Sequence, residues 1–575
     1  MQPLLQIKNL QVDFASDETK SAAVKNISFN VARGKITAIV GESGSGKSVT
    51  ALSILQLLPT PPAIYTNGEV LFTRNNNDVV DLLKIPPKEL QKIRGNEIAM
   101  IFQEPMTSLN PVYTCGSQVM ETIKLHQKTS KKEAFQKTIQ LFEKVKLPDP
   151  TGIFNRYPHQ LSGGQKQRVM IAMAMSCSPS LLIADEPTTA LDVTVQKTIL
   201  RLIKELQQQE NMSVIFITHD LGVVAEIADS VVVMYRGEIV EEGTVNEIFK
   251  HPVHWYTKAL LSCRPALYNK GERLLTIADF TNNDNRLPTA EENLPITNRQ
   301  QAEGDNHLLN NIPLIEVKNL NVWFPSKKKF LSKPSEYVKA VDNVSFNVIK
   351  GETLGLVGES GCGKSTLGRT LLRLIEPTSG TILFDGKDLA SYSKEELRVL
   401  RKEIQIIFQD PYSSLNPRLT IGTTIIEPLK VHRILSNEKQ RKDKVMELLE
   451  KVNLKPEHFN RYPHEFSGGQ RQRICIARTL ALNPSFIICD ESVSALDVSV
   501  QAQILNLLND LKKDFGFTAI FISHDLSVVR YISDRIIVMN KGRIEEEGTA
   551  NEIYYHASKE YTQQLISSIP RGFVA

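Results

Sequence analysis

Two stretches of the chain place glycines, a lysine and a serine in the spacing of a phosphate-binding loop, Gly41 to Ser48 and Gly358 to Ser365. Glycines let backbone N–H groups turn toward phosphate oxygens at the positive end of a helix. The lysine then reaches the β- and γ-phosphates, and the serine hydroxyl ligates Mg²⁺. The pattern therefore predicts two sites for ATP with Mg²⁺. The expected ATP contacts are Gly41, Ser43, Gly44, Gly46, Lys47, Ser48 and Val49, and Gly358, Ser360, Gly361, Gly363, Lys364, Ser365 and Thr366.

Each half of the chain also contains an apolar run that ends in two carboxylates. The runs are Leu181 to Glu186 and Phe486 to Glu491. Strands this apolar belong in the middle of a parallel sheet, where ligands bind at the carboxyl ends of the strands. The aspartates would hold Mg²⁺ through water and the glutamates would polarise an attacking water, although a simple cap at a strand end is the alternative. The predicted metal residues are Asp185 and Asp490, and the predicted catalytic residues are Glu186 and Glu491.

A second glycine-rich loop precedes a helical stretch in each half, at Leu161 to Gln165 and at Phe466 to Gln470. Each presents another helix N-terminus that suits an anion. One domain has no need of two such sites beside one nucleotide, so each second loop is expected to face a nucleotide held by a neighbouring domain. The residues assigned to this contact are Ser162, Gly164, Ser467 and Gly469.

The motifs belong to an internal repeat. From the carboxylate pair onward the second half follows the first by 305 residues, as Glu186 and Glu491 show. The stretch 281–313 is rich in asparagine and charge and has no helical or strand periodicity, which predicts a flexible linker. The expected domains are residues 1–265, a polar tail and linker at 266–313, and residues 314–575.

Strands and helices must position these loops. Lys35 to Val40 is a short apolar run that ends in the first phosphate loop, and a helical pattern starts at Lys47. Residues 1–14 alternate apolar and polar side chains, which predicts a strand. Strand, loop and helix in this order are typical of an α/β fold.

Composition excludes several classes of function. The chain has 68 basic and 64 acidic residues among 575, a balance that gives no footprint for nucleic acid. No apolar stretch approaches the roughly 18–20 residues that span a bilayer. Its six cysteines include no C-x-x-C pair, which argues against a cysteine-based zinc site and favours a reducing compartment. A cytoplasmic chain that reaches a membrane only through partners is expected.

The motifs occur in the same order in both halves, and in this order both halves resemble the ATP-binding cassettes of ABC transporters. The resemblance covers almost the whole chain apart from the linker, and implies two tandem P-loop ATPase domains, each a RecA-like core with a mixed sheet, a helical subdomain and an antiparallel β subdomain. It implies Gln103 and Gln409 as further metal ligands and His219 and His524 as catalytic contacts of the γ-phosphate. It also implies head-to-tail pairing of the two cassettes, in which the Lys47 loop faces Ser467 and the Lys364 loop faces Ser162.

The residues around these motifs resemble the peptide/nickel importers. Examples are residues 102–111 and 408–417 around the two glutamines, and residues 251–261. The resemblance implies an ATPase that drives import of peptides, nickel or related solutes at the cytoplasmic face of the membrane. Its partners would be two permeases and, indirectly, an extracytoplasmic solute-binding protein. A soluble tandem-cassette ATPase of the ribosome is the alternative, although the linker lacks the charged helical pattern typical of that class.

The resemblance also requires an aromatic side chain that stacks on adenine. Phe14 and Phe324 occupy matching positions in the two halves. Tyr337 is a second candidate in the second half, and packing within a strand is the alternative role for each.

Overall fold

The computed structural model describes residues 2–15, 20–74, 76–103, 108–189, 191–281, 312–325, 337–494 and 496–569. These residues form two compact units, the first mainly residues 1–261 and the second mainly residues 262–569. Each unit contains a four-stranded and a six-stranded sheet with helices, which confirms the predicted α/β class. Among the described residues, no helix has the length and apolar character needed to cross a bilayer.

The unit boundary differs from the predicted one. Residues 266–280 were expected to be a polar tail that leads into the linker, and in the structure this segment belongs to the second unit. This segment contains η3 (Pro265–Leu267) and α12 (Ile277–Thr281). It is ordered because the second unit binds its backbone, as shown below. The rest of the predicted linker, residues 282–311, lies outside the described residues.

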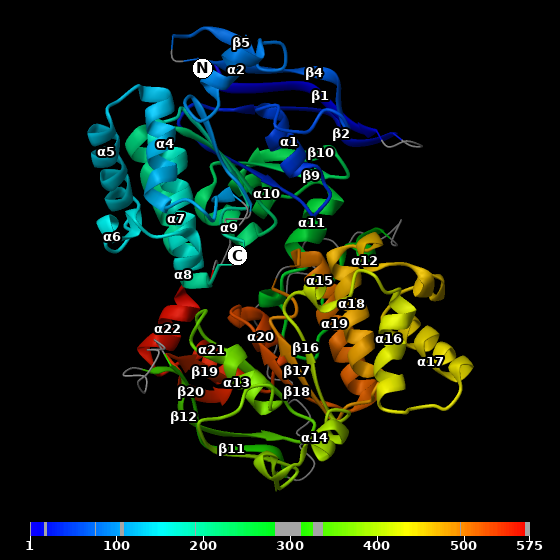
Figure 1. Ribbon diagram of the computed structural model, residues 1–575. Coiled ribbons are helices and arrows are strands. Elements are labelled where there is room, and N and C mark those ends of the chain that lie inside the picture. Colours follow the sequence, from blue (N-terminus) through cyan, green and yellow to red (C-terminus); the bar gives the residue numbers. More distant parts are fainter. Residues whose placement is uncertain are drawn as a thin grey trace. The chain divides into compact units, whose positions relative to one another are not determined.

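The first unit begins with an antiparallel sheet in the order β2-β1-β4-β5. Its strands are β1 (Leu5–Ala15), β2 (Lys20–Val31), β4 (Ala63–Thr73) and β5 (Val79–Asp81). The strand expected within residues 1–14 is β1, whose Leu5, Ile7, Leu10 and Val12 are buried, and an irregularity in the pairing between Ile7 and Leu10 interrupts the alternation. The sheet is the blue part of Figure 1.

The six-stranded sheet of the first unit has the order β10-β9-β3-β8-β7-β6. Its strands are β3 (Ile36–Val40), β6 (Ile98–Ile101), β7 (Leu181–Asp185), β8 (Ser213–Thr218), β9 (Ser230–Tyr235) and β10 (Glu238–Thr244). All neighbours pair in parallel except the edge strand β10. Strands β3, β7 and β8 are buried at every position because helices cover both faces of a parallel sheet.

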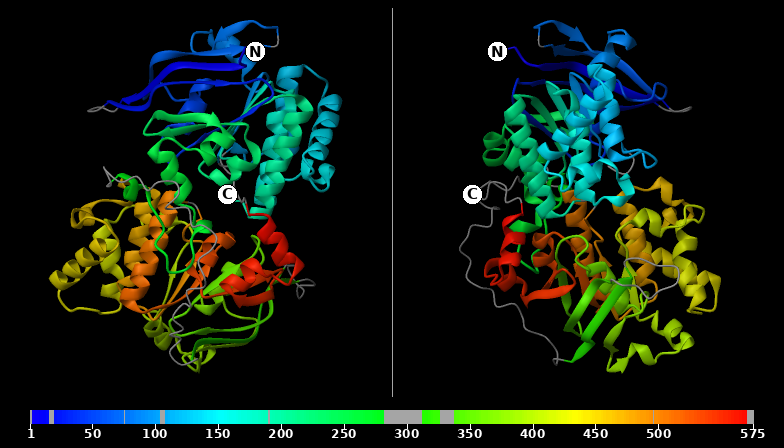
Figure 2. Two further views of the ribbon diagram at one scale, coloured as in Figure 1. Left: turned by 180° about the vertical axis from the view of Figure 1, so that it is seen from behind. Right: turned by 60° about the vertical axis from the view of Figure 1, so that its left-hand side comes forward.

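The helices of the first unit form two groups. Helices α4, α5 and α6 pack together with α7 as a separate layer beside the sheet (Figure 1 and Figure 2). Their bounds are α4 (Cys115–Gln127), α5 (Lys131–Lys144), α6 (Pro150–Phe154) and α7 (Gly163–Ala174). The remaining helical elements are α1 (Lys47–Ile54), α2 (Pro87–Ile93), η1 (Pro158–Gln160), η2 (Met175–Cys177), α8 (Val193–Glu210), α9 (Leu221–Ile227), α10 (Val245–Lys250) and α11 (Trp255–Ser262).

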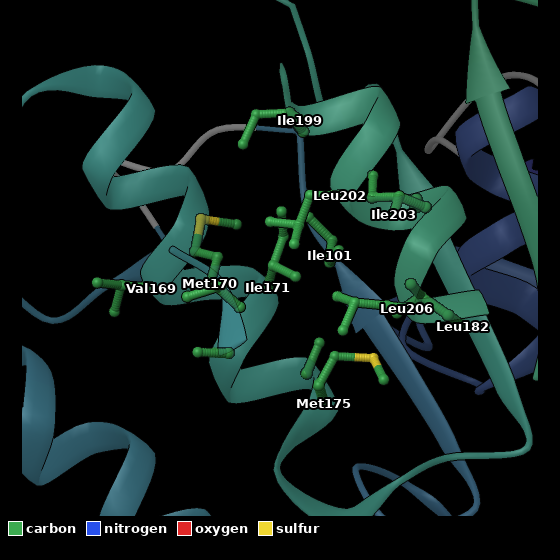
Figure 3. Packing of buried hydrophobic residues seen from close by; sticks show 14 of the residues in the cluster. Ile101, Val169, Met170, Ile171, Met175, Leu182, Ile199, Leu202, Ile203 and Leu206 are labelled. Atoms are coloured by element: carbon green, nitrogen blue, oxygen red, sulfur yellow. The ribbon is translucent and has the colours of Figure 1, made fainter. Parts of the chain in front are cut away.

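One apolar core joins the helical layer of the first unit to its sheet. Figure 3 shows Ile101 of β6 and Leu182 of β7 in one cluster with Met170, Ile171 and Met175 and with apolar residues of α8. These side chains are at most a few per cent exposed. The core therefore fixes α7, and with it the glycine-rich loop at its start, against the strands that carry the carboxylates.

The second unit repeats this architecture. Its sheets have the orders β12-β11-β14-β15 and β16-β17-β18-β13-β19-β20. The strands are β11 (Pro313–Pro325), β12 (Tyr337–Ile349), β13 (Thr353–Val357), β14 (Ser379–Phe384), β15 (Lys387–Asp388), β16 (Ile404–Ile407), β17 (Phe486–Asp490), β18 (Thr518–Ile522), β19 (Arg535–Asn540) and β20 (Arg543–Thr549). The helical elements are α13 (Lys364–Leu371), η4 (Leu389–Ser391), α14 (Lys394–Leu400), α15 (Pro411–Ser414), α16 (Ile421–Val431), α17 (Glu438–Lys451), η5 (Pro456–Asn460), η6 (Pro463–Glu465), α18 (Gly468–Leu480), α19 (Val498–Phe515), α20 (Leu526–Ile532), α21 (Ala550–Tyr555) and α22 (Glu560–Ser567).

Candidate active sites

Sheet topology gathers the predicted site of the first unit at one edge. The four neighbouring strands β3, β8, β7 and β6 run in parallel, so their carboxyl ends lie side by side. The Lys47 loop follows β3, His219 follows β8, Asp185 ends β7, and Gln103 follows β6. The second unit has the same arrangement for the loop of Lys364, for His524, Asp490 and Gln409.

The first phosphate loop is held by its own lysine. The Lys47 ammonium donates to the carbonyl oxygens of Gly41 at 2.7 Å and Glu42 at 2.9 Å, and the side chain is 4% exposed. Gly46 is in the left-handed region at φ 101°, and a Cβ there would lie 2.8 Å from the Ala23 carbonyl oxygen. Only glycine fits this position, so the loop is preformed. Val49 lies in the first turn of α1.

The second loop repeats the first with one change. The Lys364 ammonium donates to the carbonyl oxygens of Gly358 at 2.7 Å and Glu359 at 2.9 Å. It also lies 3.8 Å from the sulfur of Cys362, where the first loop has Ser45. Burial raises the pKa of the Cys362 thiol, so this sulfur is a neutral neighbour of the ammonium. Thr366 lies in the first turn of α13.

The predicted metal residues of each unit are in contact. The Ser48 hydroxyl donates to the Asp185 carboxylate at 3.0 Å, and the Ser365 hydroxyl donates to Asp490 at 2.8 Å. Burial raises the pKa of Asp185 to about 6, against the effect of the Ser48 hydrogen bond. Burial likewise raises the pKa of Asp490. Buried carboxylates that ionise reluctantly beside a hydroxyl are suited to a divalent cation, which would supply the missing positive charge.

The predicted catalytic glutamate of the first unit, Glu186, has three polar contacts. The Gln103 amide donates to it at 3.1 Å, the Thr189 hydroxyl donates at 2.9 Å, and His219 Nδ1 lies 3.4 Å away. Burial opposes ionisation of Glu186, but His219 and Thr189 outweigh it and lower the pKa to about 2. The carboxylate is therefore charged at neutral pH. Gln103, predicted as a metal ligand, contacts this glutamate here.

The second unit places Glu491 in nearly the same surroundings. Gln409 donates to it at 2.8 Å, and His524 Nδ1 lies 3.4 Å away. Ser494, the counterpart of Thr189, instead donates to the backbone carbonyl of Glu491 at 2.9 Å. Burial opposes ionisation of Glu491, but the contact with His524 outweighs it and lowers the pKa of Glu491. In return, burial opposes protonation of His524, but Glu491 outweighs it and raises the pKa of the histidine.

The backbone of both glutamates is unusual. Glu186 and Glu491 each have φ 48°, in the left-handed region that residues other than glycine seldom adopt. A residue held there costs about 1–3 kcal/mol, which the surrounding structure must offset. Backbone hydrogen bonds from Glu186 N–H to the Ile217 carbonyl, and from Glu491 N–H to the Ile522 carbonyl, fix the conformation at 3.0 Å. This backbone conformation holds each glutamate at the carboxyl ends of the strands.

The second glycine-rich loops start helices of the helical layer. Ser162 and Ser467 are the exposed N-caps of α7 and α18, and each forms a capping box with the glutamine three residues later. A Cβ on Gly164 would lie 2.7 Å from Val195, and one on Gly469 would lie 2.4 Å from Val500. The second glycine-rich loops thus lead into α7 and α18, whereas the phosphate loops follow β3 and β13.

The aromatic residues expected near adenine differ in exposure. Phe14 of β1 is partly buried against the core of the first unit and pairs with Ala63 of the neighbouring strand β4. Phe324 is 40% exposed and pairs with Val338. Tyr337 is exposed as well and lies 6.4 Å from the Trp323 ring, between ring centroids. The adenine-stacking role of each residue stays a prediction.

Two tyrosines near the phosphate loops were missed in the sequence. The backbone N–H of Glu42 donates to the Tyr256 hydroxyl at 3.0 Å, and that of Glu359 donates to Tyr561 at 3.2 Å. The tyrosines lie on α11 and α22, 214 and 202 residues away from the loops they contact. Their shared offset of 305 residues was the one available signal.

Family models match both cassettes and the segment after the first one. The model described as ABC transporter matches residues 24–189 and 341–494. The model described as the C-terminal region of the oligopeptide/dipeptide transporter matches residues 240–289.

Named relatives match the chain along nearly its whole length. Glutathione import ATP-binding protein GsiA of Escherichia coli O157:H7 is 50% identical over 574 residues, covering 99% of this chain and 89% of that protein. The protein of the same name from Shigella sonnei (strain Ss046) has the same identity and coverage. A solved structure of MJ0796, a bacterial ABC transporter cassette, covers 41% of this chain at 32% identity with a TM-score of 0.37.

Proposed function

The chain belongs to the ATP-binding proteins of ABC transporters, and from this premise we propose that it drives the import of small peptides through separate membrane proteins. Its two cassettes bind ATP and make it an ATPase. The observation that carries the proposed cargo is the 50% identity to a glutathione import ATP-binding protein over 99% of the chain. Glutathione is a tripeptide, so short peptides are the expected class. Nickel and related solutes are the second candidates.

Each site has the residues that Mg²⁺ requires. Hydroxyl and carboxylate oxygens are the ligands this ion prefers, and Ser48 with Asp185 offers both within 3.0 Å of each other. Ser365 with Asp490 does so in the second unit. When bound, Mg²⁺ would neutralise phosphate charge. Gln103 and Gln409 would join these ligands after leaving the glutamates that they contact in this structure.

Catalysis rests on positioning and charge, which dominate phosphoryl transfer. Lys47 and Lys364 would contact the β- and γ-phosphates. Glu186 and Glu491 would hold the attacking water as charged hydrogen-bond acceptors. His219 and His524 would contact the γ-phosphate, and in moving toward it they would release the glutamates, whose pKa values they lower. A glutamate freed in this way is a stronger proton acceptor.

The two sites would be completed between cassettes. Ser162 and Ser467 are exposed N-caps of helices longer than ten residues, and such helix ends suit the γ-phosphate of a nucleotide. Within each unit these helices belong to the helical layer, so a nucleotide on the Lys47 loop would take its second anion site from Ser467. The Lys364 loop would take its own from Ser162.

The partners follow from the importer role. The chain is a subunit of a membrane transporter, and its described helices do not cross a bilayer. Two permeases would carry the transport path, a solute-binding protein would deliver peptides to them, and the chain would lie on the cytoplasmic face. The comparisons lend no support to a role on the ribosome.

Peptide uptake in cells lacking the chain tests this function. Restoring the wild-type chain should restore uptake of labelled short peptides. Restoring Glu186→Gln with Glu491→Gln should not, and the purified variant should lose ATP turnover by about 10²–10⁴-fold because the water-orienting carboxylates are gone. Glu121→Gln, at an exposed position, is the matched control and should behave as wild type.

Two results would decide against the proposal. Normal ATP turnover in the double variant would remove the catalytic assignment. Full ATP turnover by the wild-type chain without any effect on peptide uptake would contradict the proposed import of peptides, and only the ATPase activity would remain.

A further inference from the structure

The segment that follows the first cassette is bound by the second unit. We call residues 264–281 the clasp, and the surface that binds them, on α19 and α20, the receptor face. The clasp contains a fully buried leucine, Leu274, and its α12 places Ile277 at 9% exposure. It belongs to the second unit, although it follows α11, which lies almost wholly in the first unit, after one intervening residue.

Asn506 of α19 recognises the clasp backbone at two points. Its side-chain oxygen accepts from the N–H of Leu274 at 3.0 Å, and its amide donates to the Leu274 carbonyl at 2.8 Å. The asparagine is only 5% exposed. A buried amide whose oxygen and NH₂ group both lose their hydrogen-bond partner costs free energy. Asn506 therefore needs the clasp.

Arg530 of α20 is a second buried side chain that binds the clasp backbone, and it is charged. It is 4% exposed and donates to the carbonyl oxygens of Ala266 at 3.1 Å and Tyr268 at 2.7 Å. The neighbouring Tyr531, 1% exposed, donates to the carbonyl of Glu272 at 2.7 Å. The clasp carbonyls compensate for burying a guanidinium and a phenol, and its removal would leave these donors without them.

Ion pairs lie at the rim of this contact. Arg273 of the clasp lies 3.3 Å from Asp510, with both side chains more than half exposed. Lys270 pairs with Asp534. Exposed pairs contribute little, so the buried backbone hydrogen bonds and Leu274 supply most of the attachment.

The first cassette provides an internal comparison. At the constant offset of 305 residues, Asn506, Arg530 and Tyr531 correspond to Arg201, Ala225 and Glu226. Arg201 and Glu226 are exposed on α8 and α9, and Arg201 pairs with Glu205 on its own helix. The duplicated fold alone does not require a receptor face, so these residues are specific to the second cassette.

We propose that the clasp is a docking segment, with the receptor face as its binding site, and that this non-covalent attachment holds the two cassettes together independently of residues 282–311. The family model of the oligopeptide/dipeptide transporter C-terminal region ends at residue 289 and so includes the clasp. The proposal is independent of the transported substrate.

Cleavage of the folded full-length chain tests the attachment. A protease recognition sequence inserted within residues 282–311 allows the chain to be cut after folding, and size-exclusion chromatography without nucleotide then shows whether the two fragments elute together. They should, and they should still do so at high salt because the rim ion pairs contribute little. Separation of the wild-type fragments would overturn the proposal.

Three variants test whether the clasp and its receptor face hold the fragments together. Leu274→Asp places a carboxylate in the buried contact, and the cut fragments should separate. Ala278→Asp adds the same charge at an exposed position of α12 and should leave them together. Asn506→Asp, which loses the donor to Leu274 and repels its carbonyl, tests the receptor face. The uncut variants should elute at the same volume as the uncut wild-type chain.

The remaining outcomes are also decisive. If the fragments of Leu274→Asp and Asn506→Asp stay associated, another contact holds the halves and the clasp has no docking role. If uncut Leu274→Asp aggregates, Asn506→Asp decides alone. Separation in both variants, with association in Ala278→Asp, supports the docking segment.

Discussion

Asp185 has a carboxylate whose pKa is raised to about 6 by burial, against an ordinary value of 3.8. A carboxyl with a raised pKa in the folded state stabilises the fold at low pH, below its unfolded pKa, and this contribution is lost as the pH rises through about 6. At neutral pH the ionised Asp185 carboxylate is therefore unfavourable by itself, and a bound cation would relieve this cost.

Asp185→Asn should raise the melting temperature of the nucleotide-free chain at pH 7.5. The gain corresponds to at most about 3 kcal/mol for a shift of two pKa units, and it should shrink as the pH falls from 6 toward 4, where the wild-type carboxyl is protonated. Thermal unfolding at several pH values measures this. Asp443→Asn, at an exposed position, should show no such gain. A lower melting temperature for Asp185→Asn at pH 7.5 would contradict the argument.

At the scale of single residues, the sequence predicted which side chains serve one nucleotide site but not their contacts with one another. The motifs assigned Ser48 and Asp185 to one Mg²⁺, whereas the contact of His219 with Glu186 depends on the strand order, which the motifs do not give. The left-handed backbone of Glu186 has no sequence signal, since glycine is the residue expected there. Thr189 was likewise missed, because a threonine three residues after a glutamate has no recognisable pattern.

At the scale of elements, α11 and α22 act on the phosphate loops through one hydroxyl each. Tyr256 is fully buried, and its hydroxyl accepts a backbone N–H of the loop from 214 residues away. Tyr256→Phe and Tyr561→Phe keep the ring and remove this acceptor. They should raise the KM for ATP by about 3- to 10-fold, equivalent to one lost hydrogen bond, with a smaller effect on kcat.

Steady-state ATP turnover measures this effect of the tyrosines. Tyr113→Phe, at an exposed position, is the matched control. An unchanged KM in both tyrosine variants would show that the loop keeps its shape without the hydroxyls.

The approach of α7 to α8 depends on the absence of a side chain at Gly164. A Cβ there would lie 2.7 Å from Val195, so Gly164→Ala should destabilise the chain by about 1–3 kcal/mol through overpacking and lower ATP turnover. Val195→Ala in the same chain should restore much of both, because it removes the atom that clashes. Thermal unfolding and ATP turnover of the single and the double variant test this. Equal defects in Gly164→Ala with and without Val195→Ala would locate the role of Gly164 elsewhere, in contact with nucleotide.

At the scale of the whole molecule, pairing between cassettes can be tested through non-additivity. If the Lys47 loop and Ser467 form one site, Lys47→Ala with Ser467→Arg should reduce ATP turnover no further than the more severe single variant. Lys47→Ala with Ser162→Arg would damage both sites, and turnover should fall to the level of Lys47→Ala with Lys364→Ala. The opposite pattern would place each complete site within one cassette.

At this scale the sequence predicted two domains but not the ordered segment that joins the first to the second. Repetition of the motifs revealed two cassettes, but the clasp has no periodic pattern, and the polar composition of the stretch after it indicated a linker. Its partners Asn506 and Arg530 lie more than 200 residues away, on helices whose pattern is shared with the first half. Long-range recognition of backbone groups leaves no local signal in either segment.

The receptor face also makes the two repeated halves of the chain non-equivalent. A chain assembled from two copies of the first half would present Arg201 and Glu226 where the incoming tail needs Asn506 and Tyr531, and the tail would have no binding site. The tail that follows the first cassette therefore finds its binding site on the second cassette and not on a copy of the first. The order of the two cassettes along the polypeptide is thus a structural requirement of this attachment.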